Sequence, residues 1–191
     1  MSKALNILLV GVGGQGTILA SKILAEVGLL QGYDVKMTEI HGMAQRGGSV
    51  VTQVRMADQV SSPLIESGQA DYLVAFEQLE ALRWLHFLKP DGKAVVNSQK
   101  INPMTVITGA ATYPEGVLEQ ILQAAPGSRV VDALHIAREL GNMRVVNVVL
   151  LGALAKAMII PMEHWQKALE TTVPARFLDL NRRAFDLGYR S

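Results

Sequence analysis

The stretch GVGGQG, residues 11–16, has the residue types and spacing of a phosphate-binding turn. Its glycines follow the pattern Gly-x-Gly-x-x-Gly, with the apolar run Leu5–Val10 before them and a helical pattern from Thr17 after them. Glycine lets the backbone adopt positive φ and approach a ligand closely, and the free N–H groups at a helix N-terminus attract anions. The pattern predicts a cofactor-binding turn formed by Gly11, Gly13, Gly14, Gln15, Gly16 and Thr17.

A bound dinucleotide is one interpretation of this turn. Glu39 ends the next predicted strand about 20 residues later, where an acid that binds a ribose is often found. The alternative is a tight strand–helix crossing that holds no ligand permanently. The dinucleotide is disfavoured because little chain remains to hold a substrate and because no Tyr-x-x-x-Lys pair is present. The chain also lacks the Gly-x-x-x-x-Gly-Lys-[Ser/Thr] motif of nucleoside triphosphate sites.

Composition restricts the class of protein. Hydrophobic residues make up 49% of the 191 residues, charged residues 18%, and the formal net charge is +1, which indicates neither a nucleic-acid nor a membrane partner. The start MSKALNILLV runs directly into the glycine turn and does not resemble a signal peptide. The weakly polar stretch Val145–Ile160 is interrupted by Asn147 and Lys156 and is too short to span a bilayer. We therefore expect a cytoplasmic protein.

The chain contains no cysteine. It can therefore form no disulfide, no cysteine-ligated iron–sulfur cluster, no thiolate zinc site and no cysteine nucleophile.

Apolar runs typical of strands alternate with helical patterns along the first two thirds of the chain. The predicted strands are 5–10, 34–40, 49–56, 71–76, 93–97 and 128–133, and 104–108 (MTVIT) is a candidate for a further short strand. The predicted helices are 17–30, 77–88, 114–125, 134–140, 145–158, 162–171 and 175–187. This alternation predicts an α/β, Rossmann-like, three-layer fold with a parallel-rich sheet and a helical C-terminal third. Without repeats or linkers, residues 1–191 are expected to form one domain.

A second glycine-rich loop, combined with the first, indicates a protein family. The wording GVGGQGT followed by EIHGMAQRGGSV resembles the gamma-type domain of 2-oxoacid:ferredoxin oxidoreductases, and most of all the small subunit of the indolepyruvate-specific branch. The stretch RVVNVVLLGALAK, residues 144–156, agrees with a late helix of that family. The resemblance covers essentially the whole chain, and the two loops together are far more specific than GVGGQG alone.

The resemblance implies a subunit of an enzyme that decarboxylates an aryl 2-oxoacid on thiamine diphosphate, passes electrons through iron–sulfur clusters to ferredoxin and forms acyl-CoA. This chain lacks both cluster cysteines and the GDG…NN pattern that holds magnesium and thiamine diphosphate. The family pattern therefore implies that a large partner subunit carries thiamine diphosphate, Mg²⁺ and the clusters, with CoA as co-substrate and this chain inactive alone. The rival interpretations are a stand-alone NAD- or FAD-binding oxidoreductase and a purely structural subunit.

Arg46, Gly47 and Gly48 in the second loop complete the candidate cofactor-binding set. An arginine fork flanked by glycines suits a carboxylate or phosphate, although a structural ion pair with Glu39 is the alternative. Asn147, inside an apolar helix, needs a partner, which is either the first glycine loop or another subunit. Glu77 and Glu80 are interpreted as a solvated helix face, and no catalytic residue is predicted.

Overall fold

The computed structural model describes residues 4–41 and 48–191. Among them, six strands form one mixed sheet in the order β2-β3-β1-β4-β5-β6. The strands are β1 (Leu5–Val12), β2 (Asp34–His41), β3 (Ser49–Ala57), β4 (Ala70–Ala75), β5 (Leu88–Asn97) and β6 (Arg129–Val131). β3 runs antiparallel to both its neighbours, and the pairs β1–β4, β4–β5 and β5–β6 are parallel. Five of the strands therefore share one direction, as predicted.

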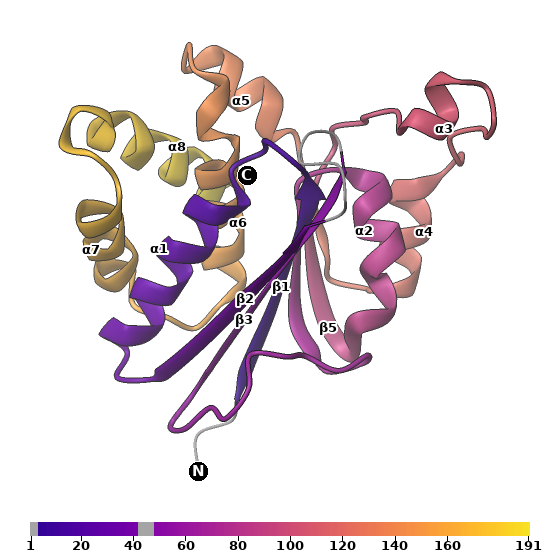
Figure 1. Ribbon diagram of the computed structural model, residues 1–191. Helices are drawn as coiled ribbons and strands as arrows, with labels where there is room; N and C mark the ends of the chain where they lie inside the picture. The colour runs from indigo at the N-terminus through magenta and orange to yellow at the C-terminus, as the bar shows by residue number, and fades with distance from the viewer. Residues whose placement is uncertain (1–3, 42–47) are drawn as a thin grey trace.

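Helices cover both faces of this sheet, which gives the three predicted layers (Figure 1). One face carries α1 (Thr17–Leu30), α5 (Ala133–Glu139), α6 (Val146–Ala157), α7 (Met162–Thr172) and α8 (Leu178–Arg190). The other carries α2 (Gln78–Trp84) and α4 (Val117–Ala124). The short helix α3 (Met104–Ile107) and the 3₁₀ turns η1 (Leu85–Phe87), η2 (Met143–Val145) and η3 (Ala175–Phe177) complete the described elements.

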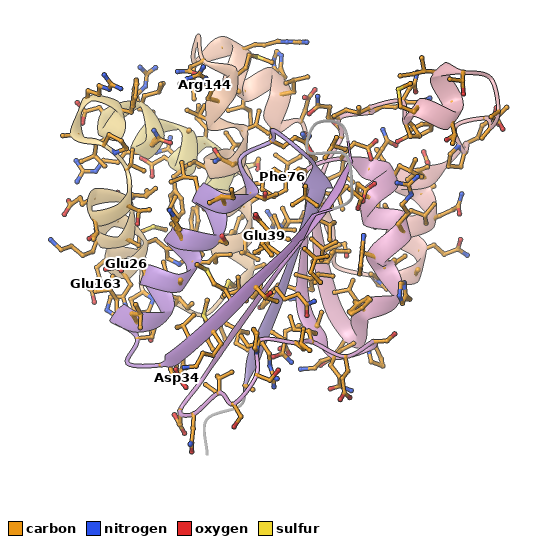
Figure 2. The ribbon with its side chains drawn as sticks, in the orientation of Figure 1. Glu26, Asp34, Glu39, Phe76, Arg144 and Glu163 are labelled. Atoms are coloured by element: carbon orange, nitrogen blue, oxygen red, sulfur yellow. The ribbon has the colours of Figure 1, made fainter. Side chains whose placement is uncertain are left out.

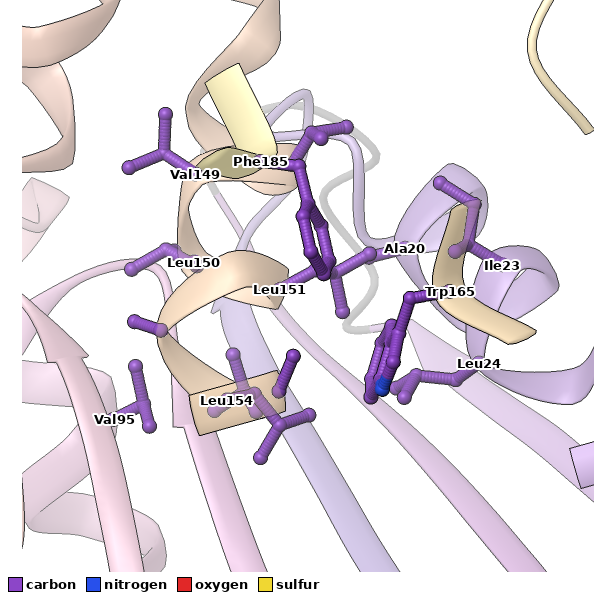
Figure 3. Close-up of a cluster of buried hydrophobic side chains, with 14 of the residues drawn as sticks. Ala20, Ile23, Leu24, Val95, Val149, Leu150, Leu151, Leu154, Trp165 and Phe185 are labelled. Carbon is purple, nitrogen blue, oxygen red and sulfur yellow. The ribbon is translucent and has the colours of Figure 1, made fainter. Parts of the chain in front are cut away.

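The core follows from the apolar pattern of the strands. Ile7 and Leu9 of β1 join the larger cluster on the α1 and α6 side, whereas Leu8 and Val10 join the cluster under α2 and α4. Residues 146–155 of α6 are all buried, because the helix lies between the sheet and α8. In the larger cluster the rings of Trp165 and Phe185 pack with centroids 5.6 Å apart (Figure 3).

Several predicted elements differ from the observed ones. The prediction of a short strand at 104–108 is wrong. These residues form the helix α3, for which Pro103 is the N-cap residue. The predicted helix 77–88 ends at Trp84, is followed by η1, and leaves Leu88 to begin β5. The last predicted helix, 175–187, divides into η3 and α8.

The connection between β2 and β3 is a hairpin, since His41 pairs with Val50 in an antiparallel ladder. β3 consequently lies between β1 and β2. The carboxyl end of β2 and the start of β3 still lie at the edge where β1 ends. The first glycine-rich turn and the strand ends that flank the second loop therefore lie at the carboxyl edge of the sheet, where open α/β sheets bind their ligands.

Candidate functional site

The first glycine turn joins β1 to α1 at this carboxyl edge. Gly16 is the N-cap of α1 with φ +84°, and Gly14, exposed at the tip, has φ +103°. No side chain of residues 4–41 or 48–191 caps the helix, so these residues leave its first N–H groups open to a ligand. Thr17, the first helical residue, is buried beneath the turn. The local geometry is that of an anion-binding helix N-terminus.

Gln15 fixes the shape of the turn. Its Oε1 accepts a hydrogen bond from the Val12 N–H at 2.7 Å, and its Nε2 donates to the Phe76 carbonyl at 3.0 Å. Nε2 also lies 3.3 Å from Oε1 of Gln99, which follows β5. A Cβ on Gly11 would lie 2.8 Å from the Gln15 Oε1 atom, so Gly11 is needed for this packing. The Gln15 amide thus ties the turn to the ends of β4 and β5.

Asn147 of α6 supports the turn from the other side. Its buried Nδ2 donates to the Gly16 carbonyl at 3.1 Å, so the partner of Asn147 is the first glycine loop, one of the two alternatives given above. A Cβ on residue 16 would lie 2.7 Å from the same Nδ2 atom. Both the positive φ and this contact therefore require glycine at position 16.

The two glycine-rich loops meet at their roots. The Gly13 N–H donates to the Gly48 carbonyl at 2.9 Å, so the end of the second loop lies directly against the first. Arg46 and Gly47 fall outside the described residues, and their predicted role stays a prediction.

A cleft of 510 Å³ opens beside the turn, between it and the start of α6. It is lined by Gly14, Gln15, Gly16, Leu19, Gln99, Leu134, Met143, Arg144, Val146 and Asn147. A second, more apolar cleft of 270 Å³ adjoins it and shares Leu19 and Arg144. Gly14, Gln15 and Gly16 of the predicted set therefore line a cavity, whereas Gly11 and Thr17 are buried and do not line it.

Arg144 is the cation of this cleft and was not among the predicted site residues. It belongs to η2, where the Asn142 Oδ1 accepts its backbone N–H at 2.9 Å, and its side chain is exposed at the carboxyl edge (Figure 2). Among the described residues, the structure records no ion pair for its guanidinium. The available sequence signal was an arginine just before an apolar helix that itself contains a buried asparagine.

Glu77 and Glu80 are buried, with exposed fractions of 1% and 2%, so their prediction as a solvated helix face is wrong. Glu77 caps α2 through Oε2, and its Oε1 accepts hydrogen bonds from the Tyr113 hydroxyl at 2.6 Å and the Ile101 N–H at 3.1 Å. Glu80 accepts from Ser49 and Arg83. Burial, reinforced by Glu77, raises the pKa of Tyr113 well above its usual range. The two carboxylates therefore have a structural role, since they join α2 to the neighbouring segments by hydrogen bonds.

Glu39 lies at the outer strand, and its Oε2 accepts a hydrogen bond from Thr52 at 3.0 Å (Figure 2). In a dinucleotide-binding fold the acid that binds ribose follows the strand next to β1. Here β3 separates the two strands, so the dinucleotide interpretation is not favoured. Within residues 4–41 and 48–191, no three acidic or histidine side chains gather as metal ligands, and no helix has the length and apolarity to cross a membrane.

Comparison with known proteins agrees with this architecture. The model of the pyruvate ferredoxin/flavodoxin oxidoreductase family matches residues 6–191. The indolepyruvate oxidoreductase subunit IorB of Pyrococcus horikoshii is 39% identical, and the match covers 99% of this chain and 96% of the relative.

Solved structures show the same fold. Pyruvate oxidoreductase subunit PORC from Thermotoga maritima superposes with a TM-score of 0.74 at 26% identity, covering 100% of this chain and 97% of that one. The 2-oxoglutarate:ferredoxin oxidoreductase from Magnetococcus marinus gives a TM-score of 0.72 at 22% identity, covering 100% of this chain but 31% of that chain. In that longer protein the fold is one part of a larger chain.

Proposed function

Because the chain belongs to the pyruvate ferredoxin/flavodoxin oxidoreductase family, we propose that it is the small subunit of an indolepyruvate-type 2-oxoacid:ferredoxin oxidoreductase. The near-complete match to an indolepyruvate oxidoreductase subunit supports this choice of substrate class. In the proposed reaction an aryl 2-oxoacid and CoA yield acyl-CoA and CO₂, and the electrons pass to ferredoxin. Residues 1–191 act as one gamma-type domain of a cytoplasmic complex.

The redox equipment belongs to a large partner subunit in this proposal. A chain without cysteine cannot ligate an iron–sulfur cluster, and the described residues offer no carboxylate cluster for Mg²⁺. When bound to the partner, thiamine diphosphate would supply the decarboxylation chemistry and the clusters would accept the electrons. This chain supplies binding surface.

The role of this chain is to bind an anionic group of CoA or of the oxoacid at the subunit interface. The observation that carries the proposal is the 510 Å³ cleft, which is lined both by the turn at the N-terminus of α1, where no described side chain caps the helix, and by Arg144. Backbone N–H groups and a guanidinium are the donors that phosphates and carboxylates prefer. The adjoining apolar cleft suits a ligand with both charged and apolar parts. Arg46, by sequence, is expected to add a second guanidinium.

The test is coexpression with the thiamine- and cluster-carrying subunit from the same genome, followed by assays with several 2-oxoacids. We expect a stable complex that reduces ferredoxin fastest with aryl 2-oxoacids and depends on CoA. A Gly14→Val variant should retain its fold but lose activity or assembly, because a β-branched residue disfavours positive φ. Full activity of this variant would favour the purely structural subunit.

A further inference from the structure

The segment between β5 and α4, residues 98–116, leaves the body of the molecule and carries α3 at its far point (Figure 1). We call residues 98–116 the arm. Met104 and Ile107 on α3 are 68% and 65% exposed. The hydrogen bonds recorded for its tip among the described residues stay within the arm, including Thr108 N–H to Met104 O and Ala111 N–H to Thr105 O, both 2.9 Å. The tip is therefore ordered by its own backbone.

The composition of the arm is unusual for a surface. No charged residue occurs from 101 to 114, although 18% of the whole chain is charged. Protein interfaces are depleted of charge at their centre and enriched in residues such as methionine. An ordered, uncharged tip with two exposed apolar side chains fits a protein contact better than a solvated loop.

Both ends of the arm are held by one buried carboxylate. The Ile101 N–H near its start and the Tyr113 hydroxyl near its end donate to the same Oε1 atom of Glu77. The Lys100 ammonium lies 4.1 Å from the centre of the Tyr113 ring, which adds a cation–π contact at this point. The direction of the arm is thus fixed before any partner binds, which lowers the entropy cost of association.

The start of the arm also touches the candidate site. The Gln99 carbonyl accepts the Gln78 N–H at 3.1 Å, and its side chain meets Gln15 of the glycine turn. Gln99 also lines the 510 Å³ cleft, so the arm begins at the cleft and one partner that binds along this edge can contact both. A partner that completes the site satisfies both features, whereas a second copy of this chain would cover the cleft without supplying the missing chemistry.

We propose that the arm docks its Met104–Ile107 tip into an apolar groove of the large, thiamine- and cluster-carrying subunit, and that this contact aligns the cleft with that subunit's active site. This inference rests on the proposed function. It adds to that function the surface by which the two chains recognise each other.

The test measures binding of the large subunit to immobilised chain variants. Ile107→Glu and Met104→Glu should each weaken assembly by about tenfold or more, as is typical of central interface residues. Ile159→Glu is the matched control, because Ile159 is fully exposed at the opposite edge of the sheet, and it should bind as the wild type does. Thermal melts of each free variant should be unchanged.

Hydrogen exchange on the wild-type pair gives a second measurement that needs no substitution, and the amides of 102–112 should become protected on assembly. Unchanged binding of both arm variants, or arm amides that stay unprotected, would overturn the proposed docking role of the arm and leave the proposed function intact. An equal loss in Ile159→Glu would also overturn it, as would an arm-dependent homodimer that excludes the large subunit. A wild-type chain that never binds the large subunit would overturn both proposals.

Discussion

Arg144 shows how one residue acquires a role from its neighbours. It lines the same cleft as the glycine turn, and no ion pair is recorded for its guanidinium among the described residues. Arg144→Ala is expected to raise the KM for CoA or the oxoacid by about tenfold to a hundredfold, since a hydrogen bond to a charged group contributes roughly 1.5–3 kcal/mol. Arg144→Lys should recover part of this loss, because a point charge replaces the fork incompletely.

Steady-state kinetics of the reconstituted complex measure this effect. Arg138→Ala is the control, because Arg138 is exposed on neighbouring α5 and lines neither cleft. Equal KM changes in the two variants would show that Arg144 acts only through the long-range field of its charge and makes no direct contact with the ligand. Arg46→Ala is expected to behave like Arg144→Ala, on the sequence argument alone.

Tyr113 gives a prediction about pH at the same scale. Its folded-state pKa lies above the unfolded value of about 10, chiefly because of burial and then the hydrogen bond to Glu77. The folded state therefore holds this proton more tightly, and the stability it contributes is present below about pH 10 and is lost as the pH rises further. Tyr113→Phe should unfold more easily at neutral pH and lose less stability between pH 9 and about 11.

Urea unfolding at several pH values measures the Tyr113 contribution. Tyr189→Phe is a control, since Tyr189 is more than a third exposed. Parallel pH curves for the wild type and Tyr113→Phe would show that the Tyr113 proton is not linked to folding.

At the scale of elements, α6 and α8 pack so closely that glycine is required where they touch. A Cβ on Gly188 would lie 1.9 Å from the Val149 carbonyl oxygen, and backbone cannot yield as a side chain end can. Gly188→Ala should therefore destabilise the fold at or above the roughly 1–3 kcal/mol typical of overpacking. Chemical denaturation measures this, with exposed Arg183→Ala expected within about 0.5 kcal/mol of the wild type. If Gly188→Ala leaves the free energy of unfolding nearly unchanged, the two helices can move apart at little cost.

The same scale shows what the sequence could predict. Buried strands such as β1 and helix α1 follow from apolar runs, periodicity and glycine stops, which are local signals. Residues 104–108 look like a strand, but they have no neighbouring strand to pair with and form α3. Glu77 is buried and accepts hydrogen bonds from Ile101 and Tyr113, which lie far along the chain and give no local signal in the sequence. Arg144 joined the site through tertiary packing, which spacing along the sequence does not reveal.

At the scale of the whole molecule, the fold offers a surface and a cleft at the carboxyl edge of the sheet. The chain has no cysteine, and the part that the structure describes contains no cluster of metal ligands. The hairpin strand β3 also separates Glu39 from the strand that leads into the glycine turn. In the proposed function the redox chemistry enters with a partner, and the same fold covers 31% of the chain of one longer solved structure.

This arrangement predicts how the isolated chain behaves. Purified alone, it should show only the absorption of its aromatic residues, carry no stoichiometric iron or flavin, and release no CO₂ from any 2-oxoacid. Adding the thiamine- and cluster-carrying subunit should produce CoA-dependent ferredoxin reduction that saturates as the two chains reach their native ratio. Near-ultraviolet and visible spectra, metal analysis and titrations with NAD(H), FAD and CoA measure the first part, and the reconstitution assay measures the second.

The large subunit alone is the control, and its full activity without this chain would contradict a role in completing the active site. A tightly retained flavin would instead favour a stand-alone oxidoreductase, because a flavin would give the glycine turn a ligand that needs no partner.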